Sequence, residues 1–198
     1  MKLFFRIIVP IVPTGKVTGI FKSGVQCDAN NYRPITVLPT LSKILEKAVH
    51  EQFYTYLNAN NLISSKQFAF RPKLSTGTSL THFTDNVLNN MDNGYLTSAV
   101  FLDTSKAFDT IDNFRLIRKL KSVGVDNNSI EWFESYLMNR SRVIVVGSVV
   151  SSAAAMNIVV PQGSILGPSF FLVYINNLTT CKLHSNISLY ADDTILYI

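Results

Sequence analysis

Two adjacent carboxylates, Asp192 and Asp193, stand near the end of the chain in the stretch LYADDT, between the apolar runs ISLY and TILYI. Like charges a few ångströms apart repel strongly where water is scarce, so a positive partner between them is expected. Mg²⁺ suits this place, because it prefers oxygen ligands and usually takes one or two protein carboxylates. Asp is also a favoured turn residue, so these two acids taken alone are equally consistent with a surface hairpin turn.

A third acid has the right setting to complete such a site. Asp103 ends the apolar run AVFLD, and a strand that finishes in an acid delivers that acid to the end of a sheet. Asp109 and Asp112 have simpler explanations, as a loop acid and a helix cap. Asp103 is therefore the expected partner of the LYADDT pair.

The elements that must position these acids follow from hydrophobic periodicity. Helical spacing predicts amphipathic helices over residues 41–58 and from residue 80 to a stop at Asn93-Gly94. The short apolar segment 96–103 predicts a buried strand. The expected apolar faces of these helices, and of a third that starts at Asp112, include Leu41, Ile44, Leu80, Leu88, Met91 and Phe114.

The second half of the chain has its own start and stop signals. Asp112 is a candidate N-cap for the third helix, which Gly124 ends, and Asn128 with Glu131 resembles a capping box for a fourth. Residues 142–150 and 156–160 are β-rich, and Pro168 suits the first turn of a last helix. A strand, the two-acid turn and another strand follow. This mixture predicts an α+β fold with a mostly antiparallel sheet and packed helices.

Composition sets broad limits on the class of protein. The chain has 198 residues, of which 47% are hydrophobic and 16% charged, and this excludes a disordered chain. The formal net charge of +5 is compatible with a polyanionic partner. Cys27 and Cys181 lie far apart, which indicates neither a disulfide framework nor a zinc site, and favours a reducing, intracellular compartment. No apolar run is long enough to span a membrane, and Arg6, Pro10 and Pro13 argue against a signal peptide.

Five blocks in order carry a resemblance to a known family: NYRPITVLPTLSKILEK, QFAFRPKLST, AVFLDTSKAFDTID, VVPQGSILGPSFFLVYINNL and LYADDT. Together they resemble the reverse transcriptase domain of non-LTR retrotransposons, the jockey-like elements in particular, over about Gly15 to Ile198. The resemblance implies a right-hand polymerase fold with fingers over residues 15–95 and a palm over 96–198 that lacks its final part and the thumb. Residues 1–14 match nothing in the family.

The resemblance also implies an activity, RNA-directed DNA polymerisation, and a site for it. Asp103, Asp192 and Asp193 fall on the catalytic metal-binding triad, with Asp193 in the least direct role, and the main-chain carbonyl of Thr104 is expected to complete a metal shell. The implied cofactor is a pair of Mg²⁺ ions, for which Mn²⁺ can substitute.

Substrate contacts are implied at further positions. Phe108 matches the aromatic residue under the incoming sugar, which selects deoxynucleotides. Gln162 and Gly163 match the nucleotide-binding PQG turn, and Arg71 matches the arginine that reaches the triphosphate. Arg33 and Lys43 lie in the block placed along the template. The implied partners are an RNA template, a DNA primer and dNTPs, in the nucleus or cytoplasm, with no membrane and no protein partner inferred.

Several positions depart from the family pattern. A glycine is replaced at Ala69 and at Val159, a proline at Gly19 and an acid at Asn177. A Cβ at Ala69 or Val159 costs about 1 kcal/mol if the backbone there needs a positive φ. The missing thumb predicts weak or no activity for these residues alone. The alternative function is a non-catalytic nucleic-acid-binding remnant. An RNA-dependent RNA polymerase is disfavoured by Phe108 and by YADD, and an unrelated α+β domain with an acidic turn by the ordered blocks.

Overall fold

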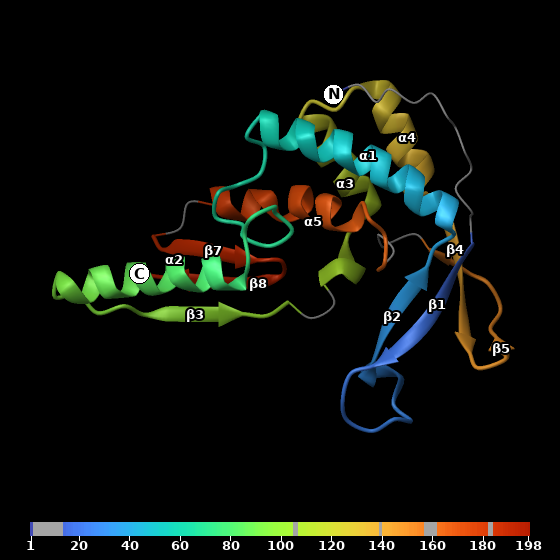
Figure 1. Cartoon of the computed structure of the whole chain (residues 1–198), viewed down its shortest axis with the longest axis horizontal. Helices are drawn as coiled ribbons and strands as arrows, with labels where there is room; N and C mark the ends of the chain where they lie inside the picture. The colour runs from blue at the N-terminus through green and yellow to red at the C-terminus, as the bar shows by residue number, and fades with distance from the viewer. Residues whose placement is uncertain (2–13, 105–106, 139, 157–161, 182–183) are drawn as a thin grey trace.

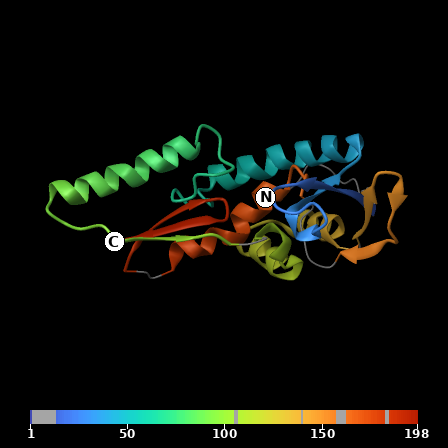
Figure 2. The same ribbon diagram turned by 90° about the horizontal axis from the view of Figure 1, so that it is seen from below.

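The structure is a computed structural model, and it describes residues 1, 14–104, 107–138, 140–156, 162–181 and 184–198. Helices and two separate sheets build the fold (Figure 1). Figures 1 and 2 place the three-stranded sheet with one long helix at one end of the molecule and the other sheet at the opposite end. The predicted α+β class is confirmed.

The larger sheet has five strands, in the order β2-β1-β4-β5, and β6 also pairs with β4. Its strands are β1 (Thr14–Phe21), β2 (Tyr32–Val37), β4 (Arg140–Val146), β5 (Val149–Val150) and β6 (Ala154–Met156). All pairs are antiparallel except β1 with β4, which run parallel. Sequence periodicity missed β1 and β2. This sheet takes strands from both sides of residue 95, so the division into fingers and palm stays a prediction.

The smaller sheet has three antiparallel strands in the order β3-β8-β7. They are β3 (Ala99–Leu102), β7 (Asn186–Tyr190) and β8 (Asp193–Tyr197). All four residues of β3 are exposed, so the prediction of a buried strand is wrong. The reason is its place in the sheet, since β3 lies at the edge and, among the described strands, pairs with β8 alone.

The hydrophobic core lies among the helices α1 (Thr40–Ala59), α3 (Asn113–Ser122), α4 (Asn127–Leu137) and α5 (Gly167–Ile175). Phe53 of α1, Phe133 of α4 and Phe170 of α5 are completely buried, with ring centroids 5.3 to 6.0 Å apart. Three short 3₁₀ helices complete the fold: η1 (Ala29–Asn31), η2 (Ala107–Thr110) and η3 (Asn176–Thr180). The core therefore joins segments from both halves of the chain.

The remaining helix, α2 (Thr76–Asp92), packs along β7 rather than into this core. Phe83 of α2 also contacts the other two strands of the small sheet, because its ring centroid lies 5.2 Å from that of Tyr197 on β8 and 6.1 Å from that of Phe101 on β3. Six side chains expected on apolar faces are instead largely exposed, which corrects the prediction for Leu41, Ile44, Leu80, Leu88, Met91 and Phe114.

Several start and stop signals are confirmed. The carboxylate of Asp112 accepts a hydrogen bond from the Arg115 amide at 2.7 Å, and Gly124 follows the end of α3 with φ +83°. Pro168 lies in the first turn of α5. The capping box at Asn128 is wrong, because the N-cap of α4 is Asp126. Of the β-rich segment 156–160, only Met156 lies within the described residues.

Candidate active site

The two acids of LYADDT lie on a tight hairpin between β7 and β8. Pairing ends at Tyr190 opposite Asp193, so Ala191 and Asp192 form the turn. Ala191 has φ +56°, the left-handed conformation that such a turn needs at its first position. Leu189, one residue before the pairing ends, is fully buried and fixes β7. Asp192 is partly buried and Asp193 is exposed, so both acids sit at the rim of the sheet.

Asp103 reaches the same rim from the other neighbour of β8. β3 pairs with β8 as far as Leu102 opposite Thr194, so the next residues outward along the two strands are Asp103 and Asp193. Partial desolvation at the rim raises the pKa of the Asp193 carboxyl, and the charges of Asp192 and Asp103 raise it further. The fold therefore brings the three predicted acids close enough for their charges to interact.

The fit of a cation can be judged from these groups. Among the described residues, no three His, Cys, Asp or Glu side chains are gathered tightly enough to hold a metal ion as they stand. The mutual repulsion that raises the pKa of Asp193 is nevertheless what a divalent cation relieves. Thr104 follows Asp103 beyond the end of β3 and is exposed. Three carboxylates and a main-chain carbonyl are oxygen donors that suit Mg²⁺. The metal role of these residues stays a prediction.

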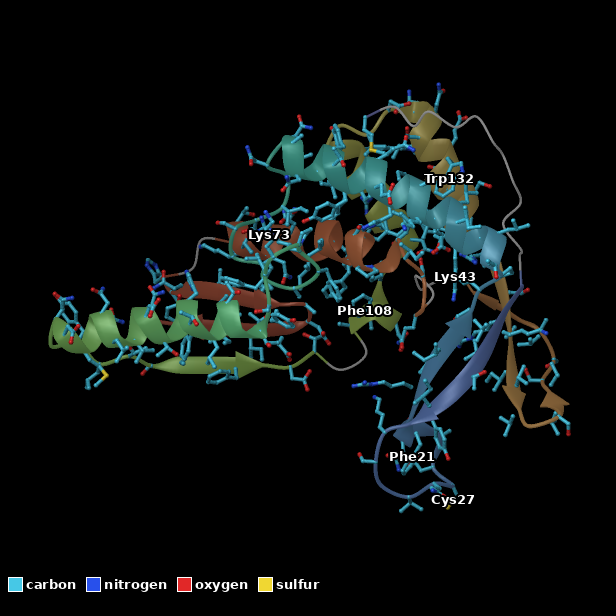
Figure 3. The ribbon with its side chains drawn as sticks, in the orientation of Figure 1. Phe21, Cys27, Lys43, Lys73, Phe108 and Trp132 are labelled. Carbon is cyan, nitrogen blue, oxygen red and sulfur yellow. The ribbon has the colours of Figure 1, made fainter. Side chains whose placement is uncertain are left out.

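Phe108 lies in η2 and is fixed by two other rings. It stacks on Phe171 of α5 with centroids 4.3 Å apart and planes 18° from parallel, and Phe70 meets its edge at 5.8 Å. Figure 3 shows Phe108 between the two sheets. The ring is partly buried, so its position is set by packing.

Gln162 and Gly163 are held from two sides. The Gln162 side-chain amide donates a hydrogen bond to the Asp109 carboxylate at 2.8 Å, and the main-chain carbonyl of Gln162 accepts one from the Thr36 amide of β2 at 2.7 Å. Gly163 has φ +109°, and a Cβ there would lie 2.6 Å from the Thr36 carbonyl oxygen. Glycine is required here by the close approach of β2. Sequence reasoning treated Asp109 as a loop acid and missed its contact with Gln162.

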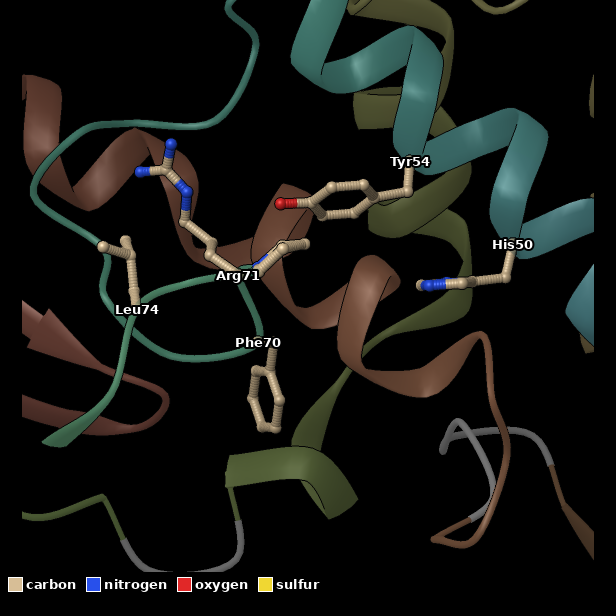
Figure 4. Close-up of a pocket in the computed structure, with 6 residues that line it drawn as sticks. His50, Tyr54, Phe70, Arg71 and Leu74 are labelled. Atoms are coloured by element: carbon tan, nitrogen blue, oxygen red, sulfur yellow. The ribbon is translucent and has the colours of Figure 1, made fainter.

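Arg71 is used within its own loop. Its Nη1 donates hydrogen bonds to the carbonyl oxygens of Ser64 at 3.0 Å and Gln67 at 3.3 Å. Figure 4 shows its guanidinium on the opposite side of the loop from the Phe70 ring, which points toward η2. Together with His50, Tyr54 and other residues of this region, Arg71 lines an open pocket of about 350 Å³. The three acids are not part of this pocket.

The two predicted template residues lie away from the acid hairpin in the chain and in the fold. Arg33 is exposed on β2, opposite Ile20 of β1. Lys43 is exposed in the first turns of α1, near the larger sheet (Figure 3). Ala69, where the family has a glycine, is buried and does not have a positive φ, so its Cβ causes no backbone strain. Val159 lies outside the described residues.

A buried carboxylate that sequence reasoning missed anchors the PQG turn. Glu46 of α1 is fully buried and accepts hydrogen bonds from the Ile165 amide at 2.7 Å, the Ser164 hydroxyl at 3.1 Å and the Tyr136 hydroxyl at 2.7 Å. Burial and the Glu46 charge raise the pKa of Tyr136. Glu46 lies three residues before the buried Val49, so an acid on the apolar stripe of α1 was the available signal.

The fold is shared with solved structures of telomerase. Apo telomerase from Candida tropicalis, truncated from its C-terminal domain, aligns with a TM-score of 0.67 and 12% identity, covering 98% of this chain and 45% of that one. Telomerase from Candida albicans, in complex with the TWJ fragment of telomeric RNA, aligns with a TM-score of 0.66 and 13% identity, over 94% of this chain and 38% of that one. The described elements therefore share their fold with these two telomerase structures.

The family described as Reverse transcriptase (RNA-dependent DNA polymerase) matches residues 20–198, and the chain belongs to this family. A probable RNA-directed DNA polymerase from transposon BS of Drosophila melanogaster is 30% identical over 179 residues, covering 84% of this chain and 19% of the relative. The polymerase from mobile element jockey of the same fly is 30% identical over 183 residues, covering 88% and 20%.

The chain therefore spans about a fifth of the length of these curated relatives. The resemblance to jockey-like retrotransposon polymerases is confirmed. Within the ranges that the structure describes, no helix has the length and apolar character needed to cross a membrane.

Proposed function

We propose that this chain supplies the nucleotide-adding centre of an RNA-directed DNA polymerase of a retroelement. The reaction joins the 3′-hydroxyl oxygen of a DNA primer to the α-phosphorus of a dNTP and releases pyrophosphate, with RNA as the template. The observation that carries the proposal is the meeting of Asp103 with Asp192 and Asp193 at one rim of the small sheet, where their charges interact.

The acids act together. Asp103 and Asp192 would hold the cations, the Thr104 carbonyl would add an oxygen donor, and Asp193 would keep the site negative from a less direct position. Two Mg²⁺ ions, or Mn²⁺ in their place, would supply the charge that activates the 3′-hydroxyl and stabilises the leaving pyrophosphate. The hairpin and the edge strand orient these carboxylates, because their backbones are fixed by the ladder of β8.

Selection of the nucleotide falls to Phe108 and the PQG turn. Because the Phe108 ring is stacked on Phe171, it cannot easily move aside for a 2′-hydroxyl, which supports a steric preference for deoxynucleotides. Gln162, held by Asp109, and Gly163 lie against the incoming nucleotide. Arg71 has the least support as a triphosphate ligand, because its hydrogen bonds go to loop carbonyls.

An RNA template and a DNA primer are the proposed partners, in the nucleus or cytoplasm. Exposed Arg33 and Lys43 offer positive charge to the template backbone, and the net charge of +5 favours any polyanion. A telomerase that shares this fold has been solved in complex with the TWJ fragment of telomeric RNA, which supports RNA as a partner.

Primer extension on poly(rA)/oligo(dT) with Mg²⁺ tests the proposal. We expect weak dTTP incorporation by the 198-residue chain, in line with the weak activity predicted for these residues alone, and a loss of about 100-fold or more on Asp103→Asn or Asp192→Asn. Asp92→Asn, an exposed acid at the far end of α2, is the matched control and should extend normally. RNA binding should survive in all three variants. RNA binding without extension by the unmodified chain would favour the non-catalytic remnant, and a preference for rNTPs would favour an RNA polymerase.

A further inference from the structure

The loop that carries Gln67 docks onto the acid hairpin. The Leu189 amide of β7 donates to the Lys66 carbonyl at 2.9 Å, and the Phe68 amide donates to the Leu189 carbonyl at 2.9 Å. Gln67 and Leu189 thus form a parallel bridge, which adds one rung to the free edge of β7. The loop and the hairpin are more than 100 residues apart in the chain, so this contact is purely tertiary.

The Gln67 side chain reaches the turn itself. It is only 2% exposed, and its Oε1 accepts hydrogen bonds from the Ala191 amide at 3.1 Å and the Ala69 amide at 3.0 Å. Its Nε2 donates to the Ala191 carbonyl at 3.4 Å. One amide side chain therefore holds both backbone groups of the residue just before Asp192. Ala191 has φ +56°, a conformation that residues with a Cβ seldom adopt, so it needs outside support.

Arg71 supports the segment that carries Gln67. Its guanidinium holds the main-chain carbonyls of Ser64 and Gln67, the two ends of the short segment that places the Gln67 amide. A continuous set of hydrogen bonds therefore runs from Arg71 through Gln67 to Ala191.

We propose that Gln67 is a positioning residue for the acid pair. By fixing Ala191 in its left-handed conformation, Gln67 keeps the carboxylates of Asp192 and Asp193 aimed at the rim shared with Asp103. This role rests on the proposed function of those acids. A second consequence is that the loop and the acid hairpin move as one body, because the same side chain bonds to Ala69 and to Ala191.

Gln67→Met tests this role, because methionine keeps the length of the side chain and removes both polar ends. We expect amide hydrogen exchange at Ala191 to accelerate more than about tenfold, while the ladder amides of β8 keep their protection. Mn²⁺ affinity, measured by titration calorimetry on the full chain, should fall by about tenfold, as when a group that orients a metal ligand is removed. The matched control is Gln52→Met, since the Gln52 amide donates within its own helix to the Ala48 carbonyl.

Ala191→Gly separates positioning from relief of backbone strain, since glycine adopts a positive φ freely. Combined with Gln67→Met, it should restore stability toward urea and leave Mn²⁺ affinity low. Restoration of both, or a Gln67→Met chain that binds Mn²⁺ as the Gln52→Met control does, overturns the proposal.

If Gln67→Met fails to fold, Gln67→Asn takes its place, because asparagine is one methylene shorter and cannot reach Ala191 in the same way. We expect the same faster exchange at Ala191 and the same loss of Mn²⁺ affinity. Loss of the folded state in both variants would make Gln67 a purely structural residue and would also overturn the proposal. The two proposals can fail separately. If Mn²⁺ binding survives Asp192→Asn, the proposed function of the acids is wrong. Hydrogen exchange at the Ala191 amide tests the role of Gln67 alone.

Discussion

At the scale of single residues, the Asp193 carboxyl reports on the whole acid group. Its pKa is raised by partial desolvation at the rim, and further by the charges of Asp192 and Asp103. A raised pKa means that the folded chain holds this proton to a higher pH than the unfolded chain does. The free energy of unfolding therefore falls as the pH rises from the ordinary pKa of an aspartate to the raised pKa of Asp193 in the folded chain. Cation binding should strengthen over the same interval, because protons no longer compete.

Asp103→Asn should lower the pKa of Asp193, because one of the neighbouring charges is removed. The value should stay above the ordinary range, since burial and Asp192 still act on the carboxyl. Carbon-detected NMR titration of the Asp193 carboxyl measures this. Asp92→Asn serves as the control and should leave the titration unchanged. An Asp193 pKa that is the same in both variants would mean that the edge strand does not deliver Asp103 to the rim.

Residue types revealed the acids but not the groups that hold them. The sequence LYADDT and the acid that ends AVFLD could be recognised because carboxylates in apolar surroundings need a chemical reason. Asp109, Glu46 and Gln67 gave little signal, since their partners lie 53 to 124 positions away in the chain. Which polar side chain meets which backbone group is fixed by tertiary packing, and single-chain patterns carry no record of it.

At the scale of elements, the N-terminus of α4 is fixed by an aspartate cap. The Asp126 carboxylate accepts hydrogen bonds from the amides of Asn128 at 3.1 Å and Ser129 at 3.2 Å, and from the Ser129 hydroxyl at 2.6 Å. Burial alone would raise the pKa of Asp126, but these hydrogen bonds and the nearby N-terminus outweigh it and lower the pKa. The ionised cap therefore stabilises α4 at any pH above the ordinary pKa of an aspartate. This stabilisation is lost as the pH falls through the lowered pKa of Asp126.

Asp126→Ala should reduce the free energy of unfolding by about 1 kcal/mol, because the first turn of α4 loses its acceptor. Asp126→Asn keeps an acceptor oxygen and should cost less. Asn128→Ala should have a small effect, since Asn128 lies inside the first turn. Urea denaturation at neutral pH measures all three. A larger loss for Asn128→Ala than for Asp126→Ala would restore the capping box that the sequence suggested.

Periodicity located the helices well and their buried faces less well. The expected helix over residues 41–58 corresponds to α1, yet Leu41 and Ile44 are exposed while Glu46 is buried. The run that forms β3 looked buried because every residue in it is apolar, but only the order of strands in the sheet decides which strand is at the edge. Faces and edges are properties of the assembled layers.

At the scale of the whole molecule, the end formed by β3 and α2 exposes apolar side chains. Phe101 of β3 is 68% exposed and Val100 is 55% exposed. An edge strand also presents unpaired backbone groups, so this end combines apolar surface with open hydrogen-bonding capacity.

We expect the chain to self-associate through this end. Sedimentation velocity across a concentration series should show a rising average sedimentation coefficient, because association removes apolar surface from water at about 25 cal/mol per Å². Val100→Thr combined with Leu102→Thr places β-branched polar side chains, which suit a strand, at both positions and should weaken association. Val37→Thr changes a valine of equal exposure, 55%, on the other sheet and should have no effect. A chain that stays monomeric throughout, or a control that weakens association equally, would show that the β3 edge is not the contact.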